Sequence, residues 1–169
     1  KKFGVSVVED TSEQGIADFV SIYSATAIRH GIEEKPPEYF GGLVAVFSPH
    51  HNVSIFFAEH DEKRIATQLV IYFGPRATSF FGGSLDTYRH LMAPYLMQFE
   101  IMCRAKARGY QWYDMWGIAA KDAENDSWYN FSIFKRNFGG VEVALVPTLD
   151  YVYDRAAYEA YFAEETSSE

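Results

Sequence analysis

Residues 53–83 read VSIFFAEHDEKRIATQLVIYFGPRATSFFGG. β-Branched and aromatic side chains are concentrated in three parts of this segment, and such residues favour β-strands. The three parts are residues 53–59, 65–73 and 77–81. Polar residues at positions 60–63 separate the first two parts and predict a tight turn, while two glycines at 82–83 end the third. The segment therefore predicts three consecutive antiparallel strands.

Two helical patterns precede these strands. Residues 3–7 alternate between apolar and smaller or polar side chains, which indicates a first strand. Thr11 and Gln14 then form a capping-box pair, so we expect a helix from about this point to residues 30–31. A second, shorter helix is expected over residues 36–47, because its two leading prolines favour a helix start.

Another helix follows the three strands. We expect it to begin at Pro94, to end before Gly109 and to be the longest helix of the chain. Residues 84–93 are then a structured approach loop. Beyond this helix the sequence predicts, in order, a strand, a helix, two short strands and a last helix, at residues 112–116, 128–138, 141–153 and from about 155 onward.

The order of these elements defines a fold class. Three antiparallel strands between a helix pair and an α-β-α-β-β tail is the order of the acetyltransferase superfamily often called GNAT. We therefore predict an α/β fold with a mixed, mostly antiparallel sheet flanked by helices. No linker or internal repeat divides the chain, so we expect one domain over residues 1–163 and a disordered tail at 164–169.

Composition excludes several classes of function. The net charge of −8 disfavours nonspecific binding of nucleic acid through its phosphates. The single cysteine, Cys103, excludes a disulfide framework, and its place in the long helix beside Met102 and Phe99 predicts a buried structural thiol. No apolar run approaches the roughly 18 residues of a membrane span and no signal peptide is recognisable, so we expect a cytoplasmic protein.

The histidines do not predict a metal site. His50, His51 and His60, with Asp61, bracket the hairpin turn without the ligand spacing of a rigid element. We interpret them as solvated loop residues. No arrangement of serine, histidine and aspartate suggests a covalent intermediate either.

Acetyl-CoA is disfavoured as a substrate. CoA-dependent members of the superfamily hold the pyrophosphate on a Gly-rich turn at the start of the long helix, where free amide groups meet the anion. Here residues 85–94 read LDTYRHLMAP, without glycine, and Pro94 lacks an amide donor. We expect no cofactor.

Several segments together resemble one family. They are AIRHG at 27–31, YRHLMAP at 88–94, YDMWGI at 113–118 and FKRNFGG at 134–140. In this order and spacing they resemble the FemABX family, non-ribosomal peptidyltransferases that attach amino acids from aminoacyl-tRNA to the stem peptide of peptidoglycan precursors. The family's Arg-Asp-Gly segment carries His30 in place of the aspartate here. The resemblance extends from about Ile16 to Tyr153.

The resemblance implies site residues. It places Lys135, preceded by Phe134, near the charge that develops when a stem-peptide amine attacks the ester carbonyl of aminoacyl-tRNA. It places Arg29, Tyr88 and Arg89 where the precursor's diphosphate and nucleotide bind. The alternatives are a solvent-facing lysine at a helix end, a structural salt bridge for Arg29 and a core aromatic for Tyr88.

Three aromatic residues are better explained as core. Trp112, Tyr113 and Trp116 belong to the strand predicted at 112–116, and alternate residues of a central strand face packed helices. We therefore interpret them as core residues and not as a ligand platform.

The resemblance also implies partners. Family members typically carry two tandem GNAT-like domains, and only the second is matched here, so a first domain is expected as a partner beside aminoacyl-tRNA and a UDP-linked or lipid-linked muramyl peptide. The alternatives are a noncatalytic or partner-dependent half-module and, more weakly, a CoA-dependent N-acyltransferase. The transferred amino acid is not indicated by any motif.

Overall fold

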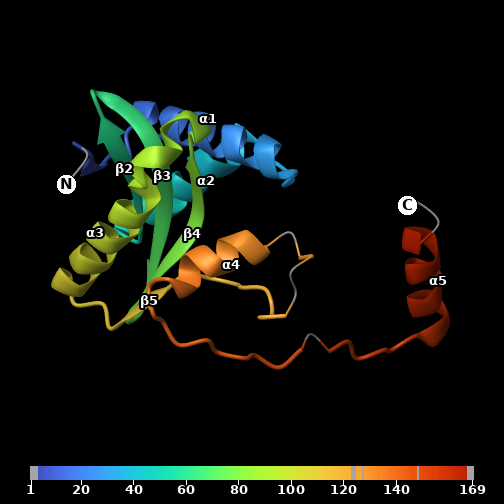
Figure 1. Ribbon diagram of the computed structural model, residues 1–169. Helices are drawn as coiled ribbons and strands as arrows, with labels where there is room; N and C mark the ends of the chain where they lie inside the picture. Colours follow the sequence, from blue (N-terminus) through green and yellow to red (C-terminus); the bar gives the residue numbers. More distant parts are fainter. Residues whose placement is uncertain (1–3, 123–124, 127, 148, 167–169) are drawn as a thin grey trace. The chain divides into compact units, whose positions relative to one another are not determined.

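The computed structural model describes residues 4–122, 125–126, 128–147 and 149–166 (Figure 1). The strands are β1 (Ser6–Glu9), β2 (Val53–His60), β3 (Lys63–Phe73), β4 (Arg76–Ser84) and β5 (Trp112–Asp114). The helices are α1 (Glu13–His30), α2 (Pro37–Phe47), α3 (Ala93–Ala107), α4 (Tyr129–Arg136) and α5 (Arg155–Thr166), with short 3₁₀ helices η1 (Ser48–His50) and η2 (Asp86–Leu91). The chain divides into two compact units, residues 1–138 and 139–169.

Within the described residues the five strands form one sheet in the order β1-β2-β3-β4-β5. Successive strands are antiparallel from β1 to β4, whereas β4 and β5 are parallel. The predicted α/β fold with a mostly antiparallel sheet is therefore confirmed. The turn between β2 and β3 is tighter than expected, because only Asp61 and Glu62 lie outside the strands and both have positive φ.

Helices cover both faces of the sheet (Figure 1). Ile55 and Phe57 of β2 pack with α1 and α2, and the intervening Phe56 packs with α3. Side chains alternate between the faces of a strand, so a central strand buried on both sides must be apolar throughout. This explains why the runs identified in the sequence are almost continuously hydrophobic.

The helix ends follow the sequence with small differences. The N-cap of α1 is Ser12, whose Oγ accepts from the Gly15 amide at 3.1 Å, so the predicted cap at Thr11 is wrong by one residue. Pro94 lies in the first turn of α3 and Gly109, with φ +90°, lies just past its end, as predicted. The longest helix is α1 with 18 residues, however, not α3 with 15.

Cys103 is exposed, which contradicts the predicted buried thiol. The buried positions of α3 include Met97, Ile101 and Ala105. Cys103 lies two residues from Ile101, about 200° around the helix, and therefore faces away from the sheet.

Two parts of the second half differ from expectation. Strand β5 ends at Asp114, because Trp116 has φ +67° and turns the chain away. Among the described residues between 141 and 153 there is no strand, so the two predicted strands are wrong. A strand needs a hydrogen-bonded neighbour, and the described residues of this segment are exposed.

The C-terminal helix extends beyond the expected limit of the domain. Helix α5 continues to Thr166, past the expected start of a disordered tail at residue 164, and residues 167–169 lie outside the described part. The extension of one domain over residues 1–163 stays a prediction. In the part of the chain that the structure describes, no helix is both long and apolar enough to cross a membrane.

The packing of α1 on β4 makes a first prediction. A Cβ atom at Gly83 would lie 2.8 Å from Ile22 O and from Thr26 Oγ1, both on α1. Gly83→Ala should therefore destabilise the protein by about 1–3 kcal/mol, because α1 must move. The exposed Gly42 of α2 has nothing within 4 Å of such an atom, so Gly42→Ala should instead stabilise by about 0.5–1 kcal/mol. Urea denaturation measures both, and equal effects would contradict the close packing.

Candidate active site

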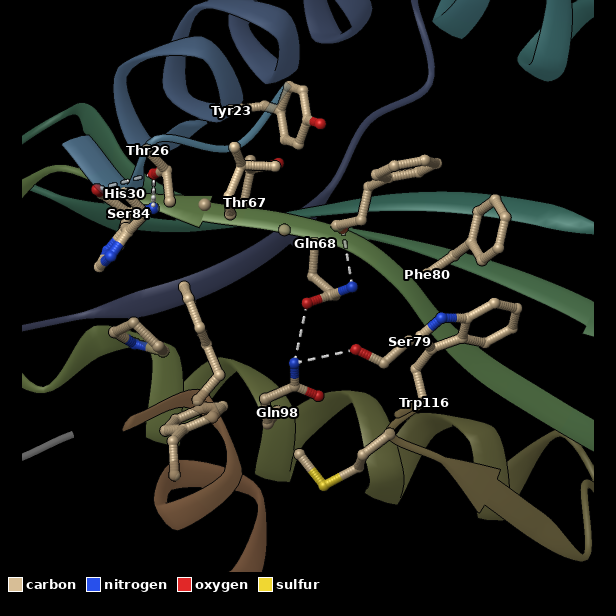
Figure 2. Close-up of a pocket in the computed structure, with 18 of the residues that line it drawn as sticks. Tyr23, Thr26, His30, Thr67, Gln68, Ser79, Phe80, Ser84, Gln98 and Trp116 are labelled. Atoms are coloured by element: carbon tan, nitrogen blue, oxygen red, sulfur yellow. Dashed lines mark hydrogen bonds between the residues drawn. The ribbon is translucent and has the colours of Figure 1, made fainter. Parts of the chain in front are cut away.

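A cavity of about 440 Å³ lies beside the part of β4 that β5 does not pair with (Figure 2). The two strands pair only from Arg76 with Trp112 to Thr78 with Asp114. Beyond Thr78, β4 has no neighbour on this side within the described residues. The lining residues are Tyr23, Thr26, Ala27, Arg29, His30, Ile32, Thr67, Gln68, Ser79, Phe80, Phe81, Gly82, Gly83, Ser84, Pro94, Met97, Gln98, Met115, Trp116, Trp128, Phe131, Phe134 and Lys135.

A buried polar network lies on one side of this cavity (Figure 2). The Gln98 amide on α3 donates to Gln68 Oε1 at 2.8 Å and to Ser79 Oγ at 3.2 Å. The Tyr113 hydroxyl of β5 donates to Gln98 Oε1. Burial raises the pKa of Tyr113, so this hydroxyl keeps its proton and remains a donor. The network connects α3, β3, β4 and β5 near the point where the pairing of β4 with β5 ends.

Gln68 also fixes an irregularity in β4. The register between β3 and β4 shifts between Leu69 and Val70, and Phe80 is left without a partner residue. The Gln68 amide donates to Phe81 O at 2.8 Å and to Leu69 O at 3.0 Å, which satisfies carbonyl groups at this bulge. A Cβ at Gly82 would approach Gln68 Oε1 to 2.5 Å, so a larger residue there would displace the Gln68 side chain.

Helix α4 provides a cationic group to the cavity. Lys135 Nζ donates to Gly117 O at 2.6 Å and lies 5.5 Å from the ring centroid of Trp128. Burial lowers the pKa of Lys135, and the negative charge of Asp114 acts in the opposite direction. The half-buried ammonium group is therefore a stronger acid than an exposed lysine.

Two further contacts connect α4 to the segment after β5. The buried Ser132 Oγ accepts from the Ala119 amide at 2.7 Å and donates to Trp128 O at 2.7 Å. Arg136 Nη2 donates to Ala119 O at 2.7 Å. At its other face, α4 packs against α3, where the ring centroids of Phe134 and Tyr95 are 4.7 Å apart. These contacts determine the position of Lys135.

The structure brings together some of the predicted site residues and not others. Phe134, Lys135 and Arg29 all line the cavity. Tyr88 and Arg89 lie on η2 outside the cavity lining. Tyr88 is partly buried against the core on the α3 side, whereas Arg89 is exposed.

The sequence interpretation missed several lining residues. Trp116, interpreted as core, is 55% exposed and lines the cavity, and Trp112 is also exposed at 62%. Tyr113 is partly buried against the core as predicted. Gln68 and Gln98 were not identified, although a glutamine within an apolar strand such as 65–73 is a recognisable signal of a buried polar contact.

The start of α3 does not fit the pyrophosphate of CoA. The Met92 amide donates to Arg89 O at 3.1 Å and the Tyr95 amide to Met92 O at 3.0 Å, while Pro94 has no N–H. A diphosphate needs free amide groups at such a helix start. The absence of CoA binding stays a prediction, now with a geometric reason. Within the described residues, no three His, Cys, Asp or Glu side chains are grouped as metal ligands.

The sheet, its short parallel fifth strand and the flanking helices define a protein with the GNAT acyltransferase fold. A GNAT-family acetyltransferase from Staphylococcus aureus Mu50 superposes with a TM-score of 0.67 at 13% identity, covering 87% of this chain and 94% of that one. The crystal structure of FemX gives a TM-score of 0.76 at 14% identity, covering 82% of this chain and 50% of that one. These similarities establish the fold.

Sequence comparison identifies the family. The model of the FemAB family matches residues 52–165. A UDP-N-acetylmuramoylpentapeptide-lysine N(6)-alanyltransferase of Weissella viridescens is 32% identical over 128 residues, which are 76% of this chain and 37% of the relative. A Lipid II:glycine glycyltransferase of Staphylococcus haemolyticus is 26% identical over 91 residues, 54% of this chain and 22% of the relative. The chain belongs to the FemAB family, and it spans well under half the length of these relatives.

The attachment of α4 makes a second prediction. Ser132→Ala would leave the buried Ala119 amide without its acceptor, at a cost of about 1–3 kcal/mol in the free energy of unfolding. Ser21→Ala, at an exposed position of α1, should change stability by no more than about 0.5 kcal/mol. Thermal unfolding of both variants measures the difference. Equal stabilities would show that the Ser132 bond contributes nothing to the attachment of α4.

Proposed function

We propose that this chain is the GNAT-like catalytic domain of an aminoacyl-tRNA-dependent peptidyltransferase, which transfers an amino acid to the stem peptide of a peptidoglycan precursor. Membership of the FemAB family supports the class of reaction, and two relatives are named as alanyl and glycyl transferases. The observation that carries the proposal is the half-buried Lys135 ammonium group in a cavity beside the free edge of β4.

The proposed reaction is aminolysis of an ester. The stem-peptide amine attacks the ester carbonyl, the C–N bond forms, and the C–O bond to the tRNA ribose breaks. The attacking amine loses a proton and the departing ribose oxygen gains one. Because the ester is activated, the protein mainly needs to orient both substrates and to stabilise the negative charge on the carbonyl oxygen.

Lys135 can supply that stabilisation. Its ammonium group has three N–H donors, and the bond to Gly117 O uses one of them, so two remain for an oxyanion. Phe134 packs on Tyr95 and Phe138 and shapes the adjoining wall. A preorganised donor in a partly desolvated site is more effective than one in water.

The remaining site residues fit a larger acceptor. Arg29 lies at the cavity, exposed enough for its guanidinium to bind the precursor's phosphates. Tyr88 and Arg89 would contact parts of the precursor that extend outside the cavity. The proposal includes a cytoplasmic location, because aminoacyl-tRNA is the donor, and a first GNAT-like domain as partner.

The main alternative is a half-module that is inactive without a partner domain. The two relatives are longer than the region matched here, which is 37% and 22% of their lengths. Titration with UDP-N-acetylmuramoyl-pentapeptide, together with transfer assays of this chain and of a version extended by a first domain, distinguishes the two. Transfer by the extended version alone would support the half-module, and transfer by neither would refute both.

The proposed role of Lys135 makes a third prediction. Lys135→Ala should lower the single-turnover rate of transfer about 10²- to 10³-fold, the typical cost of losing one oxyanion donor. Lys106→Ala removes the same charge from an exposed position of α3 outside the cavity and should leave the rate unchanged. Precursor affinity should be the same in both variants, because the lost interaction forms only in the transition state. Wild-type rates in Lys135→Ala would remove this residue from the mechanism.

The lowered pKa of Lys135 makes a fourth prediction. The transfer rate should first rise with pH as the attacking amine becomes neutral. It should then fall at a pH below the ordinary pKa of lysine, because Lys135 loses the proton that its role requires. Asp114→Asn removes the charge that opposes this loss, so the falling limb should move to lower pH. A falling limb that does not move would contradict the assignment of the limb to Lys135.

A further inference from the structure

Trp116 is an aromatic residue of the cavity to which the proposed reaction gives no role. Its side chain is 55% exposed and lines the cavity beside Phe80 (Figure 2). Its backbone has φ +67°, in the left-handed region that bulky residues rarely adopt. Such a conformation costs on the order of 1–3 kcal/mol and persists only where neighbouring contacts enforce it.

Those contacts are present around Trp116. Its amide donates to Asp114 Oδ1 at 2.8 Å, and Asp114 Oδ2 accepts from Arg76 at 2.8 Å. The indole meets the ring of Phe80 edge to face, with centroids 5.0 Å apart and planes at 83°. The backbone at Trp116 is therefore fixed and the indole is in contact with Phe80, while more than half of the residue remains open to solvent.

Two other aromatic residues of the cavity, Trp128 and Phe131, have contacts with cationic or ring groups. The Lys135 ammonium group lies 5.5 Å from the ring centroid of Trp128, and the ring centroids of Phe131 and His30 are 4.8 Å apart. An edge-to-face contact such as that of Trp116 with Phe80 covers at most one face of the indole. Trp116 therefore offers a flat surface to a ligand.

We propose that Trp116 is a stacking platform for a nucleobase. This inference rests on the proposed function, in which both substrates contain one: the donor tRNA ends in adenosine, and the soluble acceptor contains uridine. A planar base stacks on an aromatic side chain with little dependence on its identity. The cations Arg29 and Lys135 line the same cavity and suit the phosphates and ester next to a base.

The strained backbone fits this role better than simple packing. An aromatic ring that is fixed before the ligand binds loses little side-chain entropy on binding. A residue that only covered Phe80 would need no left-handed backbone, since many rotamers of an ordinary strand residue reach a neighbouring ring. The platform is thus prepared in the free protein.

Calorimetric titration of the 169-residue chain tests the platform. The probes are 3′-deoxy-3′-(L-alanylamino)adenosine, a stable analogue of the donor end, and UDP for the acceptor. Trp116→Ala should weaken binding of one probe about 5- to 150-fold, the range measured for loss of one base–aromatic stack. The probe that loses affinity identifies the substrate that stacks.

Two comparisons separate stacking from other effects. Trp116→Phe should keep most of the affinity and Trp116→Leu should not, although both retain a side chain on the same strained backbone. Trp112→Ala is the control, because Trp112 is 62% exposed on β5 and lies outside the cavity lining. It should bind both probes as the wild type does.

Several outcomes would overturn the platform. They are wild-type affinity for both probes in Trp116→Ala, equal affinity in the Phe and Leu variants, and binding of neither probe by the wild type. Transfer assays keep the proposed function separate. If probe binding depends on Trp116 but no form of the enzyme transfers an amino acid, the proposed function is refuted and the platform is not. If the enzyme transfers an amino acid but neither donor nor acceptor affinity depends on Trp116, the platform is refuted and the function is not.

Discussion

The short pairing of β4 with β5, which ends at Thr78 and Asp114, is the constraint on which the site depends. Gln98 is 4% exposed and bonds to Gln68, Ser79 and Tyr113, one residue from each of three strands. A buried amide left without partners costs about 1–3 kcal/mol, so these bonds favour the arrangement in which all are made at once. That arrangement holds the two strands together as far as Thr78 and leaves the next part of β4 open. The cavity is the space that results.

The position of Lys135 follows from what happens at the end of β5. Asp114 binds the Trp116 amide and turns the chain, so the carbonyl groups of Gly117 and Ala119 face α4. Helix α4 binds both carbonyl groups through its basic side chains and is attached to α3 through Phe134. The segments YDMWGI and FKRNFGG are therefore physically connected, although about 15 residues of sequence separate them. The bond between Lys135 and the Gly117 carbonyl is a structural reason for the two segments to occur together in one sequence.

The strands and helices of residues 4–138 were largely predictable, because periodicity, prolines and glycines act locally. The errors arose where a distant neighbour decides. Strands at 141–153 would need a neighbouring strand to pair with, and the pattern of side chains does not show whether one is present. Trp116 was interpreted as a core residue because the alternation of strand residues was extended past Asp114. For the candidate site, motifs located Phe134, Lys135 and Arg29. They could not show that Tyr88 and Arg89 lie outside the cavity, since that depends on how η2 packs.

A shared fold does not require a shared way of holding the acyl carrier. In this chain Pro94 and the internally bonded amides of Met92 and Tyr95 remove the anion cradle at the start of α3. The cavity beside β4 depends on the buried glutamines, and α3 contributes Pro94, Met97 and Gln98 to its lining. In the proposed reaction, the phosphates of a substrate would therefore bind to side chains at the cavity, such as the guanidinium of Arg29. Under the proposed function, substrates would thus be held by side chains around the cavity and not by a backbone turn at the start of α3.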